Sequence, residues 1–216
     1  MKIIVTGNYK EEEIKIPIGK TNLVGELIIP EMATGLVLFS HGSGSSRFSP
    51  RNNMVAEELR QNGIGTLMFD LLTPEEDAIF ANRFDINLLT KRLKAATGWI
   101  MEHDHIEKLS IGYFGASTGA ASALNAAGEL SNLVKAVVSR GGRPDLSTNL
   151  GKVKSPTLFI VGELDTEVIE MNKKALKKLT CKKEMVIVPG ASHLFEEPGR
   201  LEEVARLSSN WFMQYL

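Results

Sequence analysis

The sequence predicts an α/β fold in which helices cover both faces of a mostly parallel β-sheet. From about residue 35 onwards, short apolar runs alternate with stretches of helical length, a pattern typical of repeated strand–helix units. The run at 35–40 is unbroken, as expected for a strand that is covered on both faces. Another apolar run ends at Gly115 and an alanine-rich stretch begins just after Ser117, which indicates a strand, a tight turn and a helix.

The first thirty residues predict two antiparallel strands ahead of this alternation. Three isoleucines between residues 14 and 18 alternate with a lysine and a proline, which is the period-two pattern of a half-buried strand. A second run at 23–29 follows a turn at 19–22, so we expect the two runs to pair.

The rest of the chain gives the remaining predicted boundaries. We expect strands at 35–40, 63–69, 109–114, 134–139, 157–161 and 184–188, and helices at 53–62, 88–101, 167–179 and 201–216. At 216 residues the chain is long enough for one sizeable core, and we expect residues 1–216 to form a single domain. Ligands of such a sheet bind beyond the carboxyl ends of its strands.

Composition and charge argue against several classes of function. The net charge of −1 and the pI near 6.5 give no electrostatic reason to expect a nucleic-acid or anionic-membrane partner. The single cysteine, Cys181, excludes an internal disulfide and a multi-cysteine metal site. The apolar N-terminal segment is too short and too quickly followed by acidic residues to be a signal peptide. No apolar stretch is long enough to cross a bilayer. We therefore expect a soluble, cytoplasmic protein.

The turn at Gly115–Gly119 matches the G-x-S-x-G pattern of a nucleophile elbow. Such a turn holds the serine on a strained backbone, so that its hydroxyl stands clear of the sheet. The glycines on either side are needed because side chains there would collide with neighbouring backbone. The pattern makes Ser117 the candidate nucleophile.

A nucleophilic serine needs a histidine base, and that base needs an acid to orient it. In this motif's fold the chain order is serine, acid, histidine, and His193 is the one histidine after Ser117. It follows the last predicted strand. Asp165 follows the strand at 157–161 and is the preferred acid, although it could instead cap the next helix. Asp145 and Glu163 are the lesser candidates.

The glycine-rich segment after the strand at 35–40 predicts an oxyanion hole. The segment His41–Arg47 contains His41-Gly42-Ser43-Gly44, similar to the H-G-x-G loop of esterases. Its Ser43 or Gly44 N–H would be one donor, and we favour Ser43. The second donor would be the N–H of Thr118, at the start of its helix, where the helix dipole favours negative charge.

Taken together, these motifs resemble those of the α/β-hydrolases, in particular the dienelactone-hydrolase-like family. The resemblance extends from about Leu23 to Leu216 and is carried by 40–44, 115–119, 162–165 and 190–193. It implies an α/β-hydrolase fold and hydrolysis of esters or lactones without a metal or an organic cofactor. Dienelactone hydrolase itself resembles a cysteine enzyme, whereas this elbow presents Ser117, so we expect an esterase-type relative.

Four arginines could bind an acidic group of the substrate near the same edge of the sheet. They are Arg47, Arg83, Arg140 and Arg143, and a guanidinium group suits a carboxylate or a phosphate. We name Arg47, Arg83 and Arg140 as candidate substrate-binding residues, although ion pairs that brace loops are an equal alternative. The long connection at 70–84 is a candidate partial lid.

The sequence thus predicts a serine hydrolase that acts on a small ester or lactone through an acyl-enzyme, with Ser117, His193 and Asp165 as its catalytic triad. Two alternatives stay open: a non-catalytic ligand-binding or interaction protein of the same fold, and an acyltransferase with the same nucleophile. A homodimer is a possible assembly. The cluster at His103–His105 could suggest a metal site, but we expect a helix end and a solvated turn there.

Overall fold

The structure, a computed structural model, describes residues 3–6, 9–103, 106 and 108–216. Parts of two segments considered above, the N-terminal segment and the His103–His105 cluster, lie outside the described residues. The one described member of that cluster is His103, whose Nε2 atom lies 3.6 Å from Glu12 Oε2.

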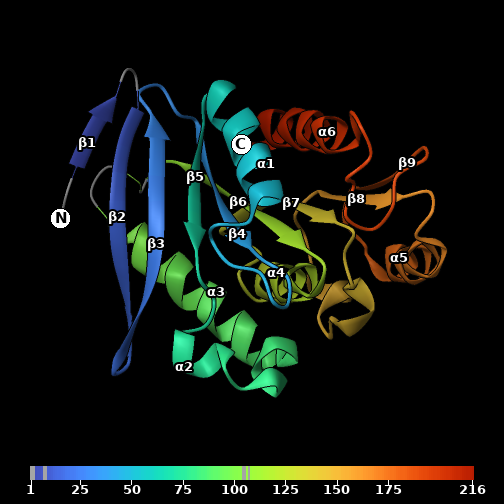
Figure 1. The fold of residues 1–216 in the computed structure, drawn as a ribbon, viewed down its shortest axis with the longest axis horizontal. Helices are drawn as coiled ribbons and strands as arrows, with labels where there is room; N and C mark the ends of the chain where they lie inside the picture. Colours follow the sequence, from blue (N-terminus) through green and yellow to red (C-terminus); the bar gives the residue numbers. More distant parts are fainter. Residues whose placement is uncertain (1–2, 7–8, 104–105, 107) are drawn as a thin grey trace.

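A nine-stranded sheet forms the centre of the described structure (Figure 1). The strands are β1 (Ile3–Thr6), β2 (Tyr9–Ile18), β3 (Thr21–Pro30), β4 (Gly35–Ser40), β5 (Ile64–Phe69), β6 (Ser110–Ala116), β7 (Val134–Arg140), β8 (Thr157–Gly162) and β9 (Lys183–Val188). Their spatial order is β1-β2-β3-β5-β4-β6-β7-β8-β9. In this spatial order, the strands β5, β4, β6, β7, β8 and β9 run parallel to one another. The pairs β1–β2, β2–β3 and β3–β5 are antiparallel. The predicted mostly parallel sheet is confirmed, and β1 is a strand that the sequence analysis did not predict.

Helices cover both faces of the parallel part of the sheet, as predicted. They are α1 (Pro50–Gln61), the short α2 (Pro74–Asp77), α3 (Ile86–Met101), α4 (Thr118–Glu129), α5 (Thr166–Lys178) and α6 (Arg200–Tyr215). In Figure 1, α1 and α6 lie above the sheet, while α3, α4 and α5 lie below it. Short 3₁₀ helices at Phe80–Phe84, Pro144–Leu146 and Leu150–Lys152 complete the connections.

The central strand β4 divides the core between these two layers. All six of its residues are buried. Leu36 and Leu38 join the cluster under α3 and α4, and Val37 and Phe39 join the cluster under α1 and α6. Because successive side chains of a strand point to opposite faces, an unbroken apolar run is what a doubly covered strand requires.

Two helices begin earlier than their hydrophobic pattern predicts, because capping residues set their starts. Helix α1 begins at Pro50, and the Ser49 side chain accepts a hydrogen bond from the Asn52 N–H. Asp85 caps α3 in the same way through the Leu88 N–H. Serine or aspartate at the cap and proline in the first turn are common helix-start signals.

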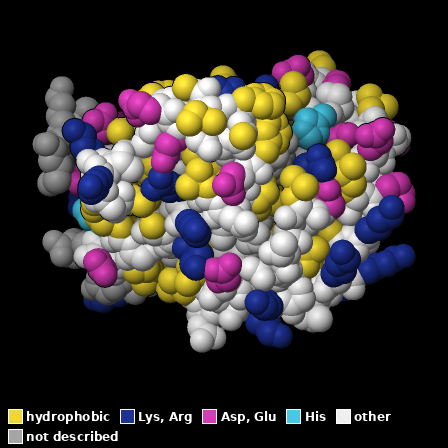
Figure 2. All heavy atoms as spheres, turned by 90° about the horizontal axis from the view of Figure 1, so that it is seen from below, with side chains coloured by type: hydrophobic (Ala, Val, Ile, Leu, Met, Phe, Trp, Pro, Cys, Tyr) yellow, Lys and Arg dark blue, Asp and Glu magenta, His cyan; other side chains and the backbone are white. Residues whose placement is uncertain are grey.

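The surface seen from below carries acidic, basic and hydrophobic side chains in a mixed pattern (Figure 2). None of the helices in the described part of the chain is both long and apolar enough to span a bilayer.

Candidate active site

Ser117 stands on a strained turn between β6 and α4. Its φ of 51° and ψ of −122° lie in a region that residues other than glycine rarely occupy, at a cost of about 1–3 kcal/mol. The residue holds the N-cap position of α4, yet its side chain makes no capping hydrogen bond. The half-buried hydroxyl therefore stays available for chemistry at the carboxyl edge of the sheet.

The elbow glycines allow three backbone segments to meet at this turn. A Cβ atom on Gly115 would lie 2.5 Å from the Ala120 Cα, and one on Gly119 would lie 2.0 Å from the carbonyl oxygen of Ser40. Both distances are far inside van der Waals contact. The collision that the sequence analysis expected for side chains at these positions is thus found, and α4 begins directly against the end of β4.

His193 and Asp165 are in direct contact. The Nδ1 atom of His193, on the loop after β9, lies 2.5 Å from Asp165 Oδ2. Asp165 holds the N-cap position of α5, but its side chain makes no capping hydrogen bond there. Its carboxylate is directed to the histidine instead, which favours the triad role over the alternative role of a helix cap.

The two lesser candidates for the acid are engaged elsewhere. Asp145 accepts hydrogen bonds from Arg143 Nε at 2.9 Å and from a terminal nitrogen of the same guanidinium at 2.8 Å. This pairing holds the pKa of the Asp145 carboxyl below its ordinary value. Glu163 accepts a hydrogen bond from the Gly190 N–H at 2.7 Å, so it braces the loop that carries His193.

The imidazole of His193 lies beside the strand end that adjoins Ser117. The Ser117 N–H donates to the carbonyl oxygen of Arg140 at 3.2 Å, and the next residue, Gly141, has a φ of +52°. A Cβ atom on Gly141 would lie 3.4 Å from His193 Cε1, so the ring rests against this glycine. Within the described residues neither Ser117 Oγ nor His193 Nε2 makes a hydrogen bond; such contacts often tighten only when substrate binds.

The candidate oxyanion loop lies against the nucleophile. A Cβ atom on Gly42 would lie 3.0 Å from the Ser117 Cβ. Thr118 is the first residue of α4, so its N–H has no partner within the helix. The Ser43 N–H donates to Thr118 Oγ1 at 2.9 Å. The two predicted donors are thus adjacent, but that of Ser43 is already engaged and would have to change partners to reach a substrate.

The side chain of His41 holds this loop in place through hydrogen bonds. The motif alone did not indicate this role. It is buried, its Nε2 atom accepts from the Leu71 N–H at 3.1 Å, and its Nδ1 atom lies 3.0 Å from the Gly42 carbonyl oxygen. Burial lowers the pKa of the His41 imidazole, more than the hydrogen bond to Gly42 raises it. A neutral ring with its proton on Nδ1 satisfies both contacts, so His41 joins the loop to the segment after β5.

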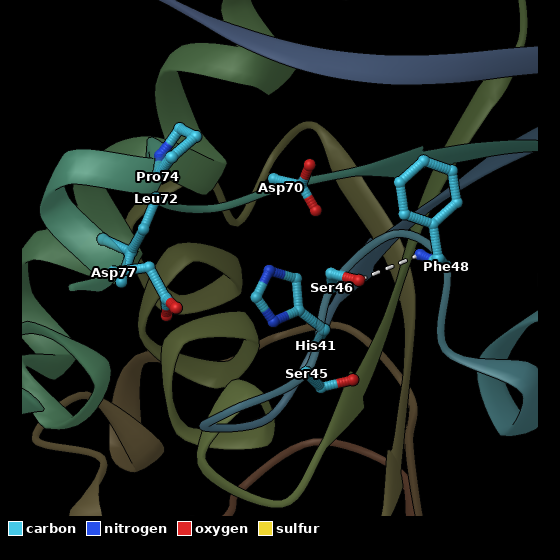
Figure 3. A pocket seen from close by; sticks show the side chains of 8 residues that line it. All are labelled: His41, Ser45, Ser46, Phe48, Asp70, Leu72, Pro74 and Asp77. Atoms are coloured by element: carbon cyan, nitrogen blue, oxygen red, sulfur yellow. Dashed lines mark hydrogen bonds between the residues drawn. The ribbon is translucent and has the colours of Figure 1, made fainter.

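A cavity of about 190 Å³ opens beside His41 (Figure 3). Figure 3 shows the imidazole between Asp77 on one side and Ser45 and Ser46 on the other, with Asp70 across the opening. The lining residues are His41, Ser45, Ser46, Phe48, Asp70, Leu72, Pro74 and Asp77. The cavity therefore lies between the candidate oxyanion loop and the predicted partial lid at 70–84.

The candidate substrate-binding arginines differ in their partners. Arg47 forms an ion pair with Asp70, and Arg83 pairs with Asp77 at 2.8 Å. Arg140 is buried and donates to Asn52 Oδ1 at 3.1 Å. A substrate anion would have to compete with a carboxylate at the first two, so substrate binding by Arg47 and Arg83 stays a prediction. Among the residues that the structure describes, no group of three or more histidine, cysteine or acidic side chains is arranged to hold a metal ion.

A comparison with protein families agrees with the arrangement of the elbow, the acid–histidine contact and the adjoining loop. The model of the dienelactone hydrolase family matches residues 37–215. The chain belongs to the dienelactone hydrolase family. A crystal structure of dienelactone hydrolase from Anabaena variabilis is 54% identical and superposes with a TM-score of 0.94, covering 97% of this chain and 100% of that one. This agreement confirms the predicted α/β-hydrolase fold.

Other members of the fold are more distant in sequence. Est1E from Butyrivibrio proteoclasticus has a TM-score of 0.80 at 16% identity, covering 94% of this chain and 98% of that one. The Pyrococcus furiosus esterase Pf2001 has a TM-score of 0.74 at 19% identity, covering 96% of this chain and 93% of that one. At such identities the likeness shows the fold alone.

Curated relatives from Mycobacterium tuberculosis are about twice as long as this chain. They are provisionally named phosphoribosyl transferases and are 51% identical over 208 residues, which is 96% of this chain. The chain spans 47% of the length of these relatives, so their name describes proteins about twice as long.

Proposed function

We propose that the protein is a serine hydrolase that cleaves a carboxylic ester or lactone of a small molecule. The observation that carries this proposal is the contact of 2.5 Å between His193 Nδ1 and Asp165 Oδ2, beside a serine on a strained elbow. An aspartate that orients a histidine close to an accessible serine hydroxyl is the arrangement that acyl transfer requires. Membership of the dienelactone hydrolase family supports hydrolase activity.

The proposed reaction has two steps, formation and hydrolysis of an acyl-enzyme. Asp165 would accept a hydrogen bond from the N–H at His193 Nδ1, so that the unprotonated Nε2 can take the hydroxyl proton of Ser117. Ser117 Oγ then attacks the carbonyl carbon, and the leaving alcohol takes the proton from Nε2 as the ester bond breaks. In the second step His193 Nε2 takes a proton from water as the water oxygen attacks the acyl carbon. It then returns that proton to Ser117 Oγ as the bond between this oxygen and the acyl carbon breaks and the acid is released.

Two backbone N–H groups would stabilise the negative charge that forms on the carbonyl oxygen. Thr118 offers the N–H at the start of α4, where the helix dipole adds to the effect. Ser43 offers the second after its hydrogen bond to Thr118 Oγ1 opens. Loss of one such donor typically costs about 2.7–4 kcal/mol of transition-state stabilisation.

The cavity beside His41 favours a small substrate. Its volume of about 190 Å³ is below the roughly 300–1,000 Å³ of sites that bury drug-sized ligands. Asp70 and Asp77 on its wall would disfavour an anionic group there, so we propose that it holds a neutral acyl or alcohol portion. Arg47 and Arg83 pair with Asp70 and Asp77. They would therefore act on the substrate by holding these two carboxylates in place at the cavity wall.

Ester hydrolysis by variants of Ser117 and His193 tests the proposal. We expect the wild type to hydrolyse short 4-nitrophenyl esters or small lactones, and we expect Ser117→Ala and His193→Gln to lose this activity by a factor of the order of 10⁶. Added alcohols would reveal an acyltransferase as new ester product. If well-folded wild type hydrolyses no member of a broad ester and lactone panel, the non-catalytic alternative replaces this proposal.

A further inference from the structure

Asn172 is a buried asparagine that joins α5 to the turn at 140–143, at the end of β7. It lies about two helical turns after Asp165 and is 0% exposed. Its side-chain nitrogen donates to the carbonyl oxygen of Gly142 at 2.9 Å and to that of Val168, one turn earlier in α5, at 2.8 Å. Because both acceptors are carbonyl oxygens, only the NH₂ group of the amide can make these contacts.

The other side of this amide is left unsatisfied. Asn172 Oδ1 is buried and makes no hydrogen bond within the described structure. A buried acceptor without a partner is costly, and an apolar side chain of similar shape would avoid this cost. The asparagine is therefore explained by what its NH₂ group holds. One of its two acceptors is local to α5, and the other, Gly142, lies 30 residues away in the sequence.

The turn held by this amide touches both the candidate nucleophile and the candidate base. At its two ends, the Arg140 carbonyl oxygen accepts the Ser117 N–H at 3.2 Å, and the Arg143 N–H donates to the Ser117 carbonyl oxygen at 3.0 Å. Between these ends, a Cβ atom on Gly141 would lie 3.4 Å from His193 Cε1 and 3.3 Å from the His193 carbonyl oxygen. A shift of the turn would therefore move the two reacting residues relative to each other.

Other elements pack closely against the same turn. A Cβ atom on Gly142 would lie 2.0 Å from Ser139 Oγ in β7 and 2.6 Å from the Ala120 Cβ in α4. The Gly141 N–H donates to the carbonyl oxygen of Ile160 in β8 at 2.8 Å. The asparagine amide adds the hydrogen bond that ties the turn to α5, the helix that carries the candidate acid.

We propose that Asn172 is a positioning residue for the candidate triad. Asp165 at the start of α5 contacts His193 Nδ1, and the same helix holds the turn on which His193 Cε1 rests. The ring is thus held at two of its atoms from one helix, while the ends of the turn hold the backbone of Ser117. Asn172 acts through the turn, and its effect on catalysis rests on the proposed function.

Asn125 offers a matched control. It is also a buried asparagine on a helix, 2% exposed on α4, and it also braces the segment that follows β7. Its Oδ1 atom accepts from the Ser147 hydroxyl at 2.7 Å and from the N–H groups of Thr148 at 3.0 Å and Asn149 at 3.2 Å. These contacts lie beyond the turn at 140–143, so Asn125→Leu should leave that turn in place.

Ester hydrolysis would compare Asn172→Leu, which removes the donors and keeps the approximate shape, with Asn125→Leu. We expect kcat to fall about tenfold to a hundredfold in Asn172→Leu with KM nearly unchanged, because small misplacements of reacting groups lower kcat steeply. We expect wild-type kcat in Asn125→Leu. Tm measured in parallel separates a change in catalysis from a loss of folded protein.

Asn172→Ser decides the same question if Asn172→Leu does not fold. A serine hydroxyl can still donate to the carbonyl oxygen one turn earlier in the helix, but it is too short to reach Gly142. The same fall in kcat is expected.

An NMR measurement tests the geometry without catalysis. The Cε1–H resonance of His193, assigned by its loss in His193→Gln, reports the surroundings of the atom that rests against Gly141. We expect this resonance to shift or broaden in Asn172→Leu and Asn172→Ser and to keep its wild-type position in Asn125→Leu. A purely structural asparagine would change Tm and leave the resonance unchanged.

Three results would overturn the proposal. They are a wild-type His193 resonance in a folded Asn172 variant, wild-type kcat in that variant, and a loss of kcat in Asn125→Leu as large as that in Asn172→Leu. If the wild type hydrolyses no ester, the proposed function fails, while the NMR comparison still decides whether Asn172 positions His193.

Discussion

Asp165 shows how a single side chain chooses between two roles that its position allows. The residue stands where a helix cap is expected, at the start of α5, but its carboxylate contacts His193 instead. The first N–H groups of α5 thus lose a side-chain acceptor, and the histidine gains a fixed orientation. The start of α5 therefore lacks a side-chain capping hydrogen bond, and the Asp165 carboxylate orients His193 in the candidate active site instead.

Asp165→Asn should lower kcat for ester hydrolysis by about 10⁴-fold, because an amide no longer favours the useful tautomer of His193. Steady-state kinetics between pH 6 and pH 9 would measure the loss. Asp145→Asn is the control, since Asp145 is engaged with Arg143. Equal losses in the two variants would argue against Asp165 as the orienting acid.

At the residue scale, sequence reasoning paired Asp165 with His193 but did not find the partners of Arg47 and Ser43. Chain order alone selected His193, and the neighbouring strand selected Asp165. The pairing of Arg47 with Asp70 joins two loops 23 residues apart, and the Ser43 N–H meets a hydroxyl 75 residues away. Such contacts depend on how loops meet in space, and no local pattern encodes them. Arg140 likewise donates to Asn52 Oδ1, 88 residues away in the sequence.

At the scale of elements, the strand–turn–helix around Ser117 is held together by close backbone contact. The boundaries of β4 and β5 came almost directly from apolar runs, because a doubly buried strand has no polar face to confuse the pattern. Helix starts were less well predicted, since α1 begins with polar residues whose role is capping. The predicted segment 70–84 contains α2, whose capping box joins Thr73 and Glu76, and its function as a lid stays a prediction.

Gly119→Ala should disrupt the elbow. The added Cβ would lie 2.0 Å from the Ser40 carbonyl oxygen, so backbone must move, and we expect a loss of about 1–3 kcal/mol or more in the free energy of unfolding together with the loss of activity. Urea denaturation and ester hydrolysis would measure the two effects.

A matched variant is Gly98→Ala, in the exposed part of α3. A Cβ there would meet nothing within 4 Å, so the same chemical change should stabilise the protein by about 0.5–1 kcal/mol through helix propensity. Equal effects of the two substitutions would contradict the close contact at the elbow.

At the scale of the whole molecule, buried His41 links unfolding to pH. Burial holds the pKa of this imidazole below its ordinary value of 6.5, whereas the unfolded chain regains that value. Below pH 6.5 the unfolded state therefore binds a proton that the folded state does not. The free energy of unfolding contributed by His41 should fall as the pH decreases, by at most about 1.4 kcal/mol per pH unit.

Urea denaturation between pH 5 and pH 8 would measure this dependence in the wild type and in His41→Gln, whose amide oxygen can still accept from the Leu71 N–H. The variant should show a shallower loss of stability towards acid pH. His103→Gln serves as the control because His103 is a partly exposed histidine. Parallel curves for wild type and His41→Gln would show that His41 is not the linked group.

The central claim is that Ser117 is an activated nucleophile, and covalent labelling with a fluorophosphonate probe tests it most directly. We predict one label per chain on wild type, located at Ser117 by mass spectrometry, and no label on a folded Ser117→Ala variant. Absence of labelling on folded wild type, or equal labelling of Ser117→Ala, would contradict the claim.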